Sequence, residues 1–262
     1  MSTVALSEIS DAEWSALSSQ RIFFGHQSVG RDIMLGVERV LEQHPEIALA
    51  LVRTDDPAAV DGAAFIEARI GRNREPATKT EAFLNVLGRG FGDEFGVLAM
   101  YKFCYVDINR DTDPEQLFSE YAGAIEDTRD RFPGVTIVHF TMPLMTANDG
   151  LGERIRTALG LPTQTRLNAI RNRYNELVRE RYAGTAPVFD LARLESTRAD
   201  GSSAFTRHGG REIPMLAAEW TSDGGHLNEA GQYHIAERLL VFLARLTAAS
   251  RKGVVDMAGN GR

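Results

Sequence analysis

The sequence predicts an α/β protein in which helices cover both faces of a five-stranded parallel sheet, giving a three-layer α/β/α sandwich of the flavodoxin-like kind. Short apolar runs alternate along the chain with stretches in which apolar residues recur at helical spacing. The runs carry few charges, as expected of parallel strands that are buried on both faces. No change in composition and no internal repeat divides the 262 residues. We therefore expect one domain over residues 1–249, followed by a disordered tail over residues 250–262.

The five expected strands are the most apolar short runs of the chain. They cover residues 22–25, 47–52, 95–101, 135–140 and 186–191. Residues 55–91 are rich in glycine and proline, so we expect an irregular region there that contains one helix, at 77–87. Two further irregular insertions are expected, at residues 144–165 and 192–220, and these are candidates for the walls of a pocket.

The expected helices begin and end at residues that favour helix boundaries. They cover residues 10–20, 28–43, 77–87, 113–132, 167–178 and 228–246. Pro45 disfavours a helical conformation at His44, so the second helix is expected to end there. Asp113 and Pro114 begin the fourth helix, because proline suits the first helical position and acidic residues suit the positive end of the helix dipole.

Composition and charge exclude several classes of partner. The formal net charge of −7 argues against a nucleic-acid partner, which requires a basic face. Cys104 is the single cysteine, so no internal disulfide can form and a reducing compartment is expected. Residues 1–8 do not have the pattern of a signal peptide, and no apolar stretch approaches the roughly 18 residues of a membrane span. We expect a cytoplasmic protein that acts on small molecules, with its oligomeric state left open.

Ser28 lies where the first expected strand passes through a tight turn into a helix. In open α/β sheets, ligands bind in the crevice beyond the carboxyl ends of the strands. A serine hydroxyl is a poor nucleophile at neutral pH and needs a base within hydrogen-bond reach. The free N–H groups and the positive dipole end of the helix would stabilise an oxyanion there. The alternative is that Ser28 only caps the helix, a role in which serine is common.

Asp223 and His226 could supply that base and the group that orients it. Their spacing of three residues places both on one turn just ahead of the last expected helix. The carboxylate can hold one nitrogen of the imidazole and leave the other free to accept the proton of Ser28. The alternative is an aspartate that caps the helix and a histidine on the surface.

Together, the serine after the first strand and the late Asp-x-x-His resemble the SGNH (GDSL-like) hydrolase superfamily. The resemblance extends over residues 21–246, and it implies a flavodoxin-like sandwich with Ser28 as nucleophile, His226 as base and Asp223 as its orienter. The residues Asp-Gly-Gly-His-Leu-Asn, at 223–228, are close to the last conserved block of the family. The opening Gly-His-Gln-Ser, at 25–28, departs from the usual Gly-Asp-Ser and is nearer a divergent branch with Gly-His-x-Ser-Val-Gly.

The oxyanion donors depart from the pattern of the family. The resemblance implies three donors: the serine N–H, a glycine N–H after the second strand, and an asparagine side chain in a Gly-x-Asn-Asp after the third strand. Residues 101–107, at the end of the third expected strand, contain neither that glycine nor that asparagine. The nearest substitutes are Gly71 and Asn73, which follow the second expected strand. Asn73 could equally be an ordinary turn residue.

His26 and Lys102 are candidate substrate-binding residues. His26 is two residues from Ser28 and could line the pocket, or its ring could be satisfied by a backbone carbonyl. Lys102 is at the carboxyl end of a strand, where it could contact a substrate carboxylate or the oxyanion, or pair with Asp107. Cys104 is expected to be buried filler rather than a nucleophile.

The other histidines carry weaker signals. His139 is expected in the core, because it lies within an apolar strand. His208 lies in a loop without a recognisable motif, and His234 is expected to be solvated on the last helix.

The resemblance implies a serine esterase that needs no cofactor and no metal. Its substrate would be a carboxylester or an acetyl ester, including an acylated carbohydrate. Three alternatives stay open at this point: an acyltransferase with the same triad, a metal-dependent hydrolase using His26, Asp223 and His226, and a non-catalytic binding module. The missing Gly-x-Asn-Asp favours the last, whereas the lack of a His-x-Glu or His-x-x-x-His cluster disfavours the metal site.

Overall fold

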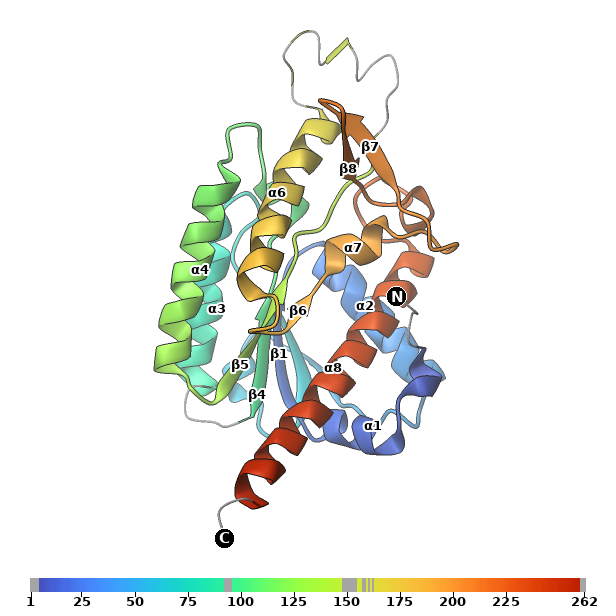
Figure 1. The fold of residues 1–262 in the computed structure, drawn as a ribbon. Helices are drawn as coiled ribbons and strands as arrows, with labels where there is room; N and C mark the ends of the chain where they lie inside the picture. The colour runs from blue at the N-terminus through green and yellow to red at the C-terminus, as the bar shows by residue number, and fades with distance from the viewer. Residues whose placement is uncertain are drawn as a thin grey trace.

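The central layer of the molecule is a parallel sheet. The structure, a computed structural model, describes residues 5–91, 96–147, 155–156, 159, 161 and 163–259. Among these residues, six parallel strands hydrogen-bond in the order β2-β3-β1-β4-β5-β6 (Figure 1). Their bounds are β1 (Arg21–His26), β2 (Leu51–Arg53), β3 (Ala64–Arg69), β4 (Val97–Tyr101), β5 (Val135–Phe140) and β6 (Val188–Phe189).

The sheet has one strand more than the five expected, because β3 lies in the region that was expected to be irregular. All residues of β3 except Arg69 are buried, including Glu67. The sequence does not indicate this strand, because a charged residue such as Glu67 is not expected in a buried strand. Its burial is tolerable because its partners, His26 and Arg53, come from β1 and β2. The edge strand β2 is shorter than residues 47–52. Phe95, expected in the next strand, lies outside the described residues.

Helices cover both faces of the sheet (Figure 1). One face carries α1 (Asp11–Ser18), α2 (Val29–Gln43), α7 (Leu191–Ser196) and α8 (Glu229–Gly259), and the other carries α3 (Pro76–Gly90), α4 (Pro114–Arg131) and α6 (Gln164–Tyr182). Two separate apolar cores result, because alternate residues of β1 point to opposite sides: Phe24 packs under α2 and α8, and Phe23 under α3. The α/β/α sandwich is therefore confirmed.

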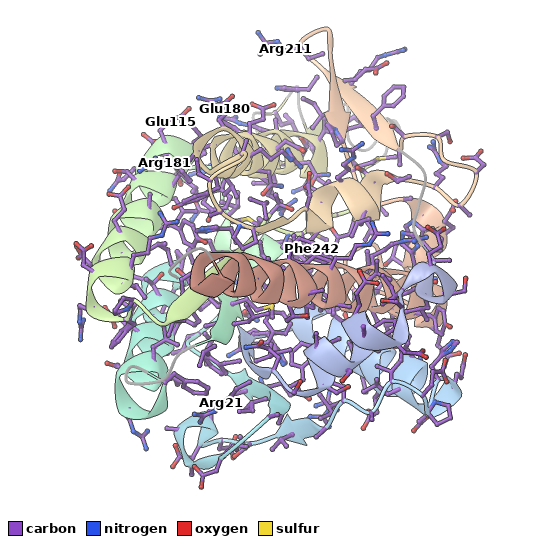
Figure 2. All side chains as sticks on the ribbon, turned by 60° about the horizontal axis from the view of Figure 1, so that its bottom comes forward. Arg21, Glu115, Glu180, Arg181, Arg211 and Phe242 are labelled. Carbon is purple, nitrogen blue, oxygen red and sulfur yellow. The ribbon has the colours of Figure 1, made fainter. Side chains whose placement is uncertain are left out.

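Side chains fill both layers between helix and sheet (Figure 2). Phe242 of α8, labelled in that view, packs edge-on against Phe189 of β6 at 5.6 Å between ring centroids. On the outer surface, α4 and α6 are joined by ion pairs of Glu115 with Arg173 and of Glu126 with Arg181. As expected, α4 begins at the Asp113 cap, whose carboxylate accepts hydrogen bonds from the next backbone N–H groups.

Two expectations near the carboxyl end are corrected. Residues 192–220 are not only loop, because they contain most of α7 and the antiparallel hairpin of β7 (Phe205–His208) and β8 (Arg211–Pro214). Helix α8 does not end near Leu246 but continues to Gly259, so residues 250–259 of the expected tail are helical.

The position of β1 explains where a site can form. From β1 the chain crosses to the edge strand β2, returns to β3 beside β1, and then passes to β4 on the other side of β1. The loops that follow β3 and β4 therefore flank the carboxyl end of β1, which is the usual ligand crevice of such a sheet. Among the described residues, no helix is both long enough and apolar enough to cross a membrane.

Candidate active site

Ser28 occupies the turn between β1 and α2 in a strained backbone conformation. Its φ of 50° and ψ of −115° lie outside the regions that residues with a Cβ favour. The hydroxyl makes no capping hydrogen bond to α2, so the interpretation of Ser28 as only a helix cap is wrong. Its backbone carbonyl instead accepts the N–H of Arg31, at 2.7 Å. Strain of this kind at a turn holds a side chain in a position that an ordinary cap would not give it.

Ser28, His226 and Asp223 form a continuous chain of hydrogen bonds. The Oγ of Ser28 lies 2.7 Å from Nε2 of His226, and Nδ1 of His226 lies 2.7 Å from Oδ2 of Asp223. The hydrogen bond to the His226 ring, followed by those from the backbone N–H groups of His226 and Gly225, holds the pKa of Asp223 well below its usual range. An ionised carboxylate accepts the proton on Nδ1, which leaves Nε2 as the acceptor for the serine hydroxyl.

The loop that carries this pair is held by its own acid and by α2. Oδ1 of Asp223 accepts the N–H groups of Gly225 and His226, at 2.9 and 2.7 Å. Asp32, in the first turn of α2, accepts the N–H of Leu227 at 3.2 Å and so ties the loop to the helix that Ser28 begins. The sequence analysis missed Asp32, because an acidic residue is common in the first turn of a helix and gives no sign of this contact.

Tyr105 is a second residue that the sequence reasoning missed. Its hydroxyl oxygen lies 3.4 Å from Nε2 of His226, and the two rings meet edge to face. A Cβ on Gly225 would lie 2.9 Å from the Tyr105 ring, so the close approach requires glycine. Arg171 of α6 holds the backbone carbonyl of Tyr105 through Nε and Nη2, at 3.1 and 3.0 Å. Burial raises the pKa of Tyr105, which keeps its hydroxyl protonated. The sequence carried no signal for this contact.

The loop that contains Gly71 and Asn73 lies beside Ser28, and it follows β3, the third strand of the chain. Gln27, the residue before Ser28, donates from Nε2 to the carbonyl of Gly71 at 2.7 Å. Gly71 has a φ of 58°, and a Cβ there would lie 2.6 Å from the backbone of Lys79. The Oδ1 of Asn73 accepts a hydrogen bond from Lys79, at 3.1 Å. Because that bond occupies the amide oxygen of Asn73, the N–H groups of the same amide point away from Lys79.

A buried ion pair joins this loop to the loop after β4. Lys79 and Asp107 are 2.5 Å apart, and their side chains are 1% and 0% exposed. Asp107 also accepts the backbone N–H of Arg74 at 2.8 Å and that of Cys104 at 2.7 Å. One carboxylate therefore fixes both loops that flank the carboxyl end of β1.

Lys102 is buried against the residue that precedes Ser28. Its side chain is buried, and Nζ lies 3.4 Å from the carbonyl of Gln27 and 3.8 Å from the sulfur of Cys104. The expected alternative of a pair with Asp107 is wrong, because Asp107 binds Lys79 instead.

His26 is buried and faces a carboxylate, not a backbone carbonyl. Its Nε2 lies 2.5 Å from Oε2 of Glu67, whose other oxygen accepts from Arg53 at 2.6 Å. Burial lowers the pKa of His26 in spite of the nearby acid. The His26 ring is therefore neutral and donates a hydrogen bond to Glu67. A Cβ on Gly30 would lie 2.3 Å from Cβ of His26. His26 is therefore part of the surface on which the first turn of α2 rests.

The other histidines considered from the sequence, and Cys104, lie in different surroundings. His139 is in the core, as expected, 2.7 Å from the hydroxyl of Tyr121. His234 is not simply solvated, because it stacks on Trp220 with 4.5 Å between ring centroids. His208 is exposed in β7, and Cys104 is buried.

The metal set considered from the sequence is not brought together. His26 binds Glu67 in the interior, whereas Asp223 and His226 bind each other and Ser28 at the surface. Over the described part of the chain, no group of three or more His, Cys, Asp or Glu residues is arranged to hold a metal ion.

Comparisons with known proteins give matches to solved structures at low sequence identity, and these matches carry no argument about function. No family model matches the sequence, and no curated protein matches it. A lipolytic protein of the G-D-S-L family from Veillonella parvula is 13% identical, with a TM-score of 0.48 over 84% of this chain and 96% of its own. An acetyl xylan esterase is 14% identical, with a TM-score of 0.45 over 84% of this chain and 97% of its own. A salicylyl-acyltransferase from a tetracycline biosynthetic pathway is 12% identical, with a TM-score of 0.42 over 87% of this chain and 55% of its own. A functional assignment rests on the side-chain geometry described above.

Proposed function

We propose that this protein is a serine hydrolase of the SGNH type that cleaves a carboxylic ester through an acyl-enzyme. The observation that carries the proposal is the unbroken chain from the strained Ser28 through His226 to Asp223, with both hydrogen bonds at 2.7 Å. Three groups in this order meet the requirement of an activated serine, namely a base within reach and an acid that orients the base.

In the acylation step, His226 accepts the proton of Ser28 as the serine oxygen attacks the ester carbonyl. The imidazolium that forms is stabilised by the carboxylate of Asp223, which also keeps the ring in the required orientation. His226 then returns the proton to the departing alcohol, and the acyl group remains on Ser28. In the second step His226 deprotonates a water molecule, whose oxygen attacks the acyl-enzyme. The bond between the acyl carbon and the oxygen of Ser28 then breaks, His226 returns the proton to that oxygen, and the acid is released.

The negative charge that develops on the carbonyl oxygen needs hydrogen-bond donors. We assign this role to the backbone N–H of Ser28 at the start of α2, the backbone of Gly71, and the side-chain amide of Asn73. The bond between Lys79 and Oδ1 of Asn73 supports the last assignment, because it leaves the amide N–H groups free to donate. The Gln27 bond to Gly71 supports it as well, since it holds that loop against the turn.

Hydrolysis is favoured over acyl transfer by the exposure of the site. The side chain of His226 is 45% exposed and that of Asp223 is 57% exposed, so water reaches the base directly. Acyl transfer to another acceptor is favoured by a site that excludes water, and the exposure of these two side chains does not provide that. Candidate substrates are small carboxylesters and acetyl esters, including acetylated carbohydrates.

Labelling with a fluorophosphonate probe tests the nucleophile. Wild-type protein should be labelled on Ser28, and Ser28→Ala or His226→Ala should abolish the labelling. Ser222→Ala is the matched control, because it removes an exposed hydroxyl next to Asp223 and should leave the labelling intact. Labelling that persists in Ser28→Ala would show that another residue is the nucleophile. Product analysis with acetyl esters, with and without added alcohol or sugar, separates hydrolysis from transfer.

A further inference from the structure

A cavity of about 390 Å³ has Tyr105, the residue that contacts His226, in its lining. The hydroxyl of Tyr105 is 3.4 Å from Nε2 of His226, so one residue contacts the catalytic base and also lines this Tyr105 cavity. Apolar side chains line part of the cavity: Val106, Ile108, Met145 and Leu167. Three arginines also line it: Arg74, Arg110 and Arg171.

The acidic groups of the Tyr105 cavity are already neutralised by other residues. Asp107 is paired with Lys79, which does not line the cavity, and Asp111 contacts Arg110 at 3.3 Å. The guanidinium of Arg171 is bound by the carbonyl of Tyr105 and by side-chain amide oxygens, none of which carries a charge. Two positive charges, on Arg74 and Arg171, are therefore left without a compensating carboxylate among the described residues that line the cavity.

Arg74 is held in an unusual backbone conformation at this cavity. Its φ of 69° lies in the left-handed region, and among the described residues only Ser28 shares a positive φ without being a glycine. The buried Asp107 holds the Arg74 backbone N–H at 2.8 Å. The side chain is exposed, and the nearby acid Glu75 is paired with Arg72. Strained backbone conformations cluster at active sites and ligand clamps. Among the described residues, no carboxylate pairs with the Arg74 side chain.

We propose that Arg74 binds an anionic group of the substrate, a carboxylate or a phosphate, within the Tyr105 cavity. This inference rests on the proposed ester hydrolysis and specifies its substrate class: an ester whose acyl or alcohol part carries that anion. A guanidinium offers two parallel N–H donors that match either group. The apolar lining accommodates the few carbons that separate the ester from the anion, and the field of Arg171 adds to the attraction.

Matched ester pairs test the proposal without turnover, in Ser28→Ala protein. The first pair is 4-acetoxybenzoate and 4-acetoxybenzamide, which places the charge on the alcohol side. The second is monophenyl adipate and its terminal amide, which places the charge on the acyl side. A third ligand, 4-acetoxyphenyl phosphate, replaces the carboxylate of the first pair by a phosphate. Calorimetric titration at low and high salt gives the affinities, and circular dichroism checks the fold of each variant.

We expect the anionic member of at least one pair to bind about tenfold tighter than its amide, as for a charge-assisted contact. The preference should disappear in Ser28→Ala/Arg74→Gln. It should persist in Ser28→Ala/Arg166→Gln, which removes an exposed arginine of α6 close to the cavity but outside its lining. High salt should reduce the preference, because the contact is partly open to solvent.

Equal binding of both members of every pair, with no binding of the phosphate, would overturn the proposal. A preference that survives Arg74→Gln would overturn it as well. These results are separate from a failure of the proposed hydrolase, which would appear as an absence of fluorophosphonate labelling at Ser28 while the Arg74-dependent preference remained.

Discussion

The ammonium group of Lys79 lies 3.1 Å from the side-chain oxygen of Asn73. The same lysine is paired with the buried Asp107, so its position is fixed by a partner that does not depend on Asn73. The contact therefore selects one of the two orientations of the Asn73 amide. In that orientation the amide N–H groups are the ones left to contact a ligand.

We predict that Asn73→Ala lowers kcat by about 100-fold, as for the loss of one oxyanion donor, with little change in KM. Steady-state kinetics with an acetyl ester as substrate measures both kcat and KM. If Lys79 acts by orienting Asn73, Lys79→Met should lower kcat in the wild-type background and have little further effect in Asn73→Ala. Fully additive losses would mean that Lys79 only stabilises the fold, and an unchanged rate in Asn73→Ala would remove that residue from the site.

Asp223→Asn should lower kcat by about 10³-fold or more, because the amide cannot stabilise the imidazolium of His226 and favours the wrong tautomer. The exposure of the Asp223 side chain, 57%, predicts that thermal stability changes little. Kinetics and a thermal melt on the same preparation measure both effects. A variant with wild-type kcat would show that His226 does not depend on this acid.

Gly30→Ala should damage the turn that presents Ser28. The added Cβ would lie 2.3 Å from Cβ of His26, so the first turn of α2 must move away from β1. We expect a loss of about 1–3 kcal/mol in the free energy of unfolding, together with slower fluorophosphonate labelling. Gly123→Ala is the control, because it lies in α4 with no atom within 4 Å of the added Cβ and should be neutral or stabilising. Equal behaviour of the two variants would contradict the packing of Gly30 on His26.

The buried Glu195 should make the free energy of unfolding depend on pH. Complete burial raises its pKa to about 8, while the N–H of Leu144 donates to one of its oxygens. The folded state therefore binds a proton that the unfolded chain releases near its ordinary pKa of 4.5, so this group makes stability fall as pH rises from about 4.5 to 8. Below that window the group has no effect on stability, and above it the loss of stability is complete, at roughly 5 kcal/mol.

Glu195→Gln should remove this loss, since the glutamine can still accept the Leu144 N–H and stays neutral at every pH. Chemical denaturation at pH 5 and pH 8 measures the difference. The variant should gain stability relative to wild type at pH 8 and change little at pH 5. A gain that is the same at both pH values would show that Glu195 does not titrate in this window.

The layered fold could be read from the sequence because its signals are local. Helix caps such as Asp113, the stop at His44-Pro45 and the apolar runs of β1, β4 and β5 each depend on neighbouring residues. The strand that was missed, β3, contains Glu67, whose burial depends on His26 and Arg53. A charge inside a strand looks like an interruption until its partners from other strands are known.

The sequence by itself determined the alternation of strands and helices and placed Ser28, Asp223 and His226 in two segments whose meeting could be expected. Only the tertiary structure decided that the serine hydroxyl faces His226 instead of capping α2, that Lys79 rather than Lys102 pairs with Asp107, and that Tyr105 adjoins the base. The physical reason is that caps, turns and periodicity act over a few residues, whereas these contacts join segments that are far apart in the sequence. Their energy depends on burial and partners that only packing around the sheet supplies.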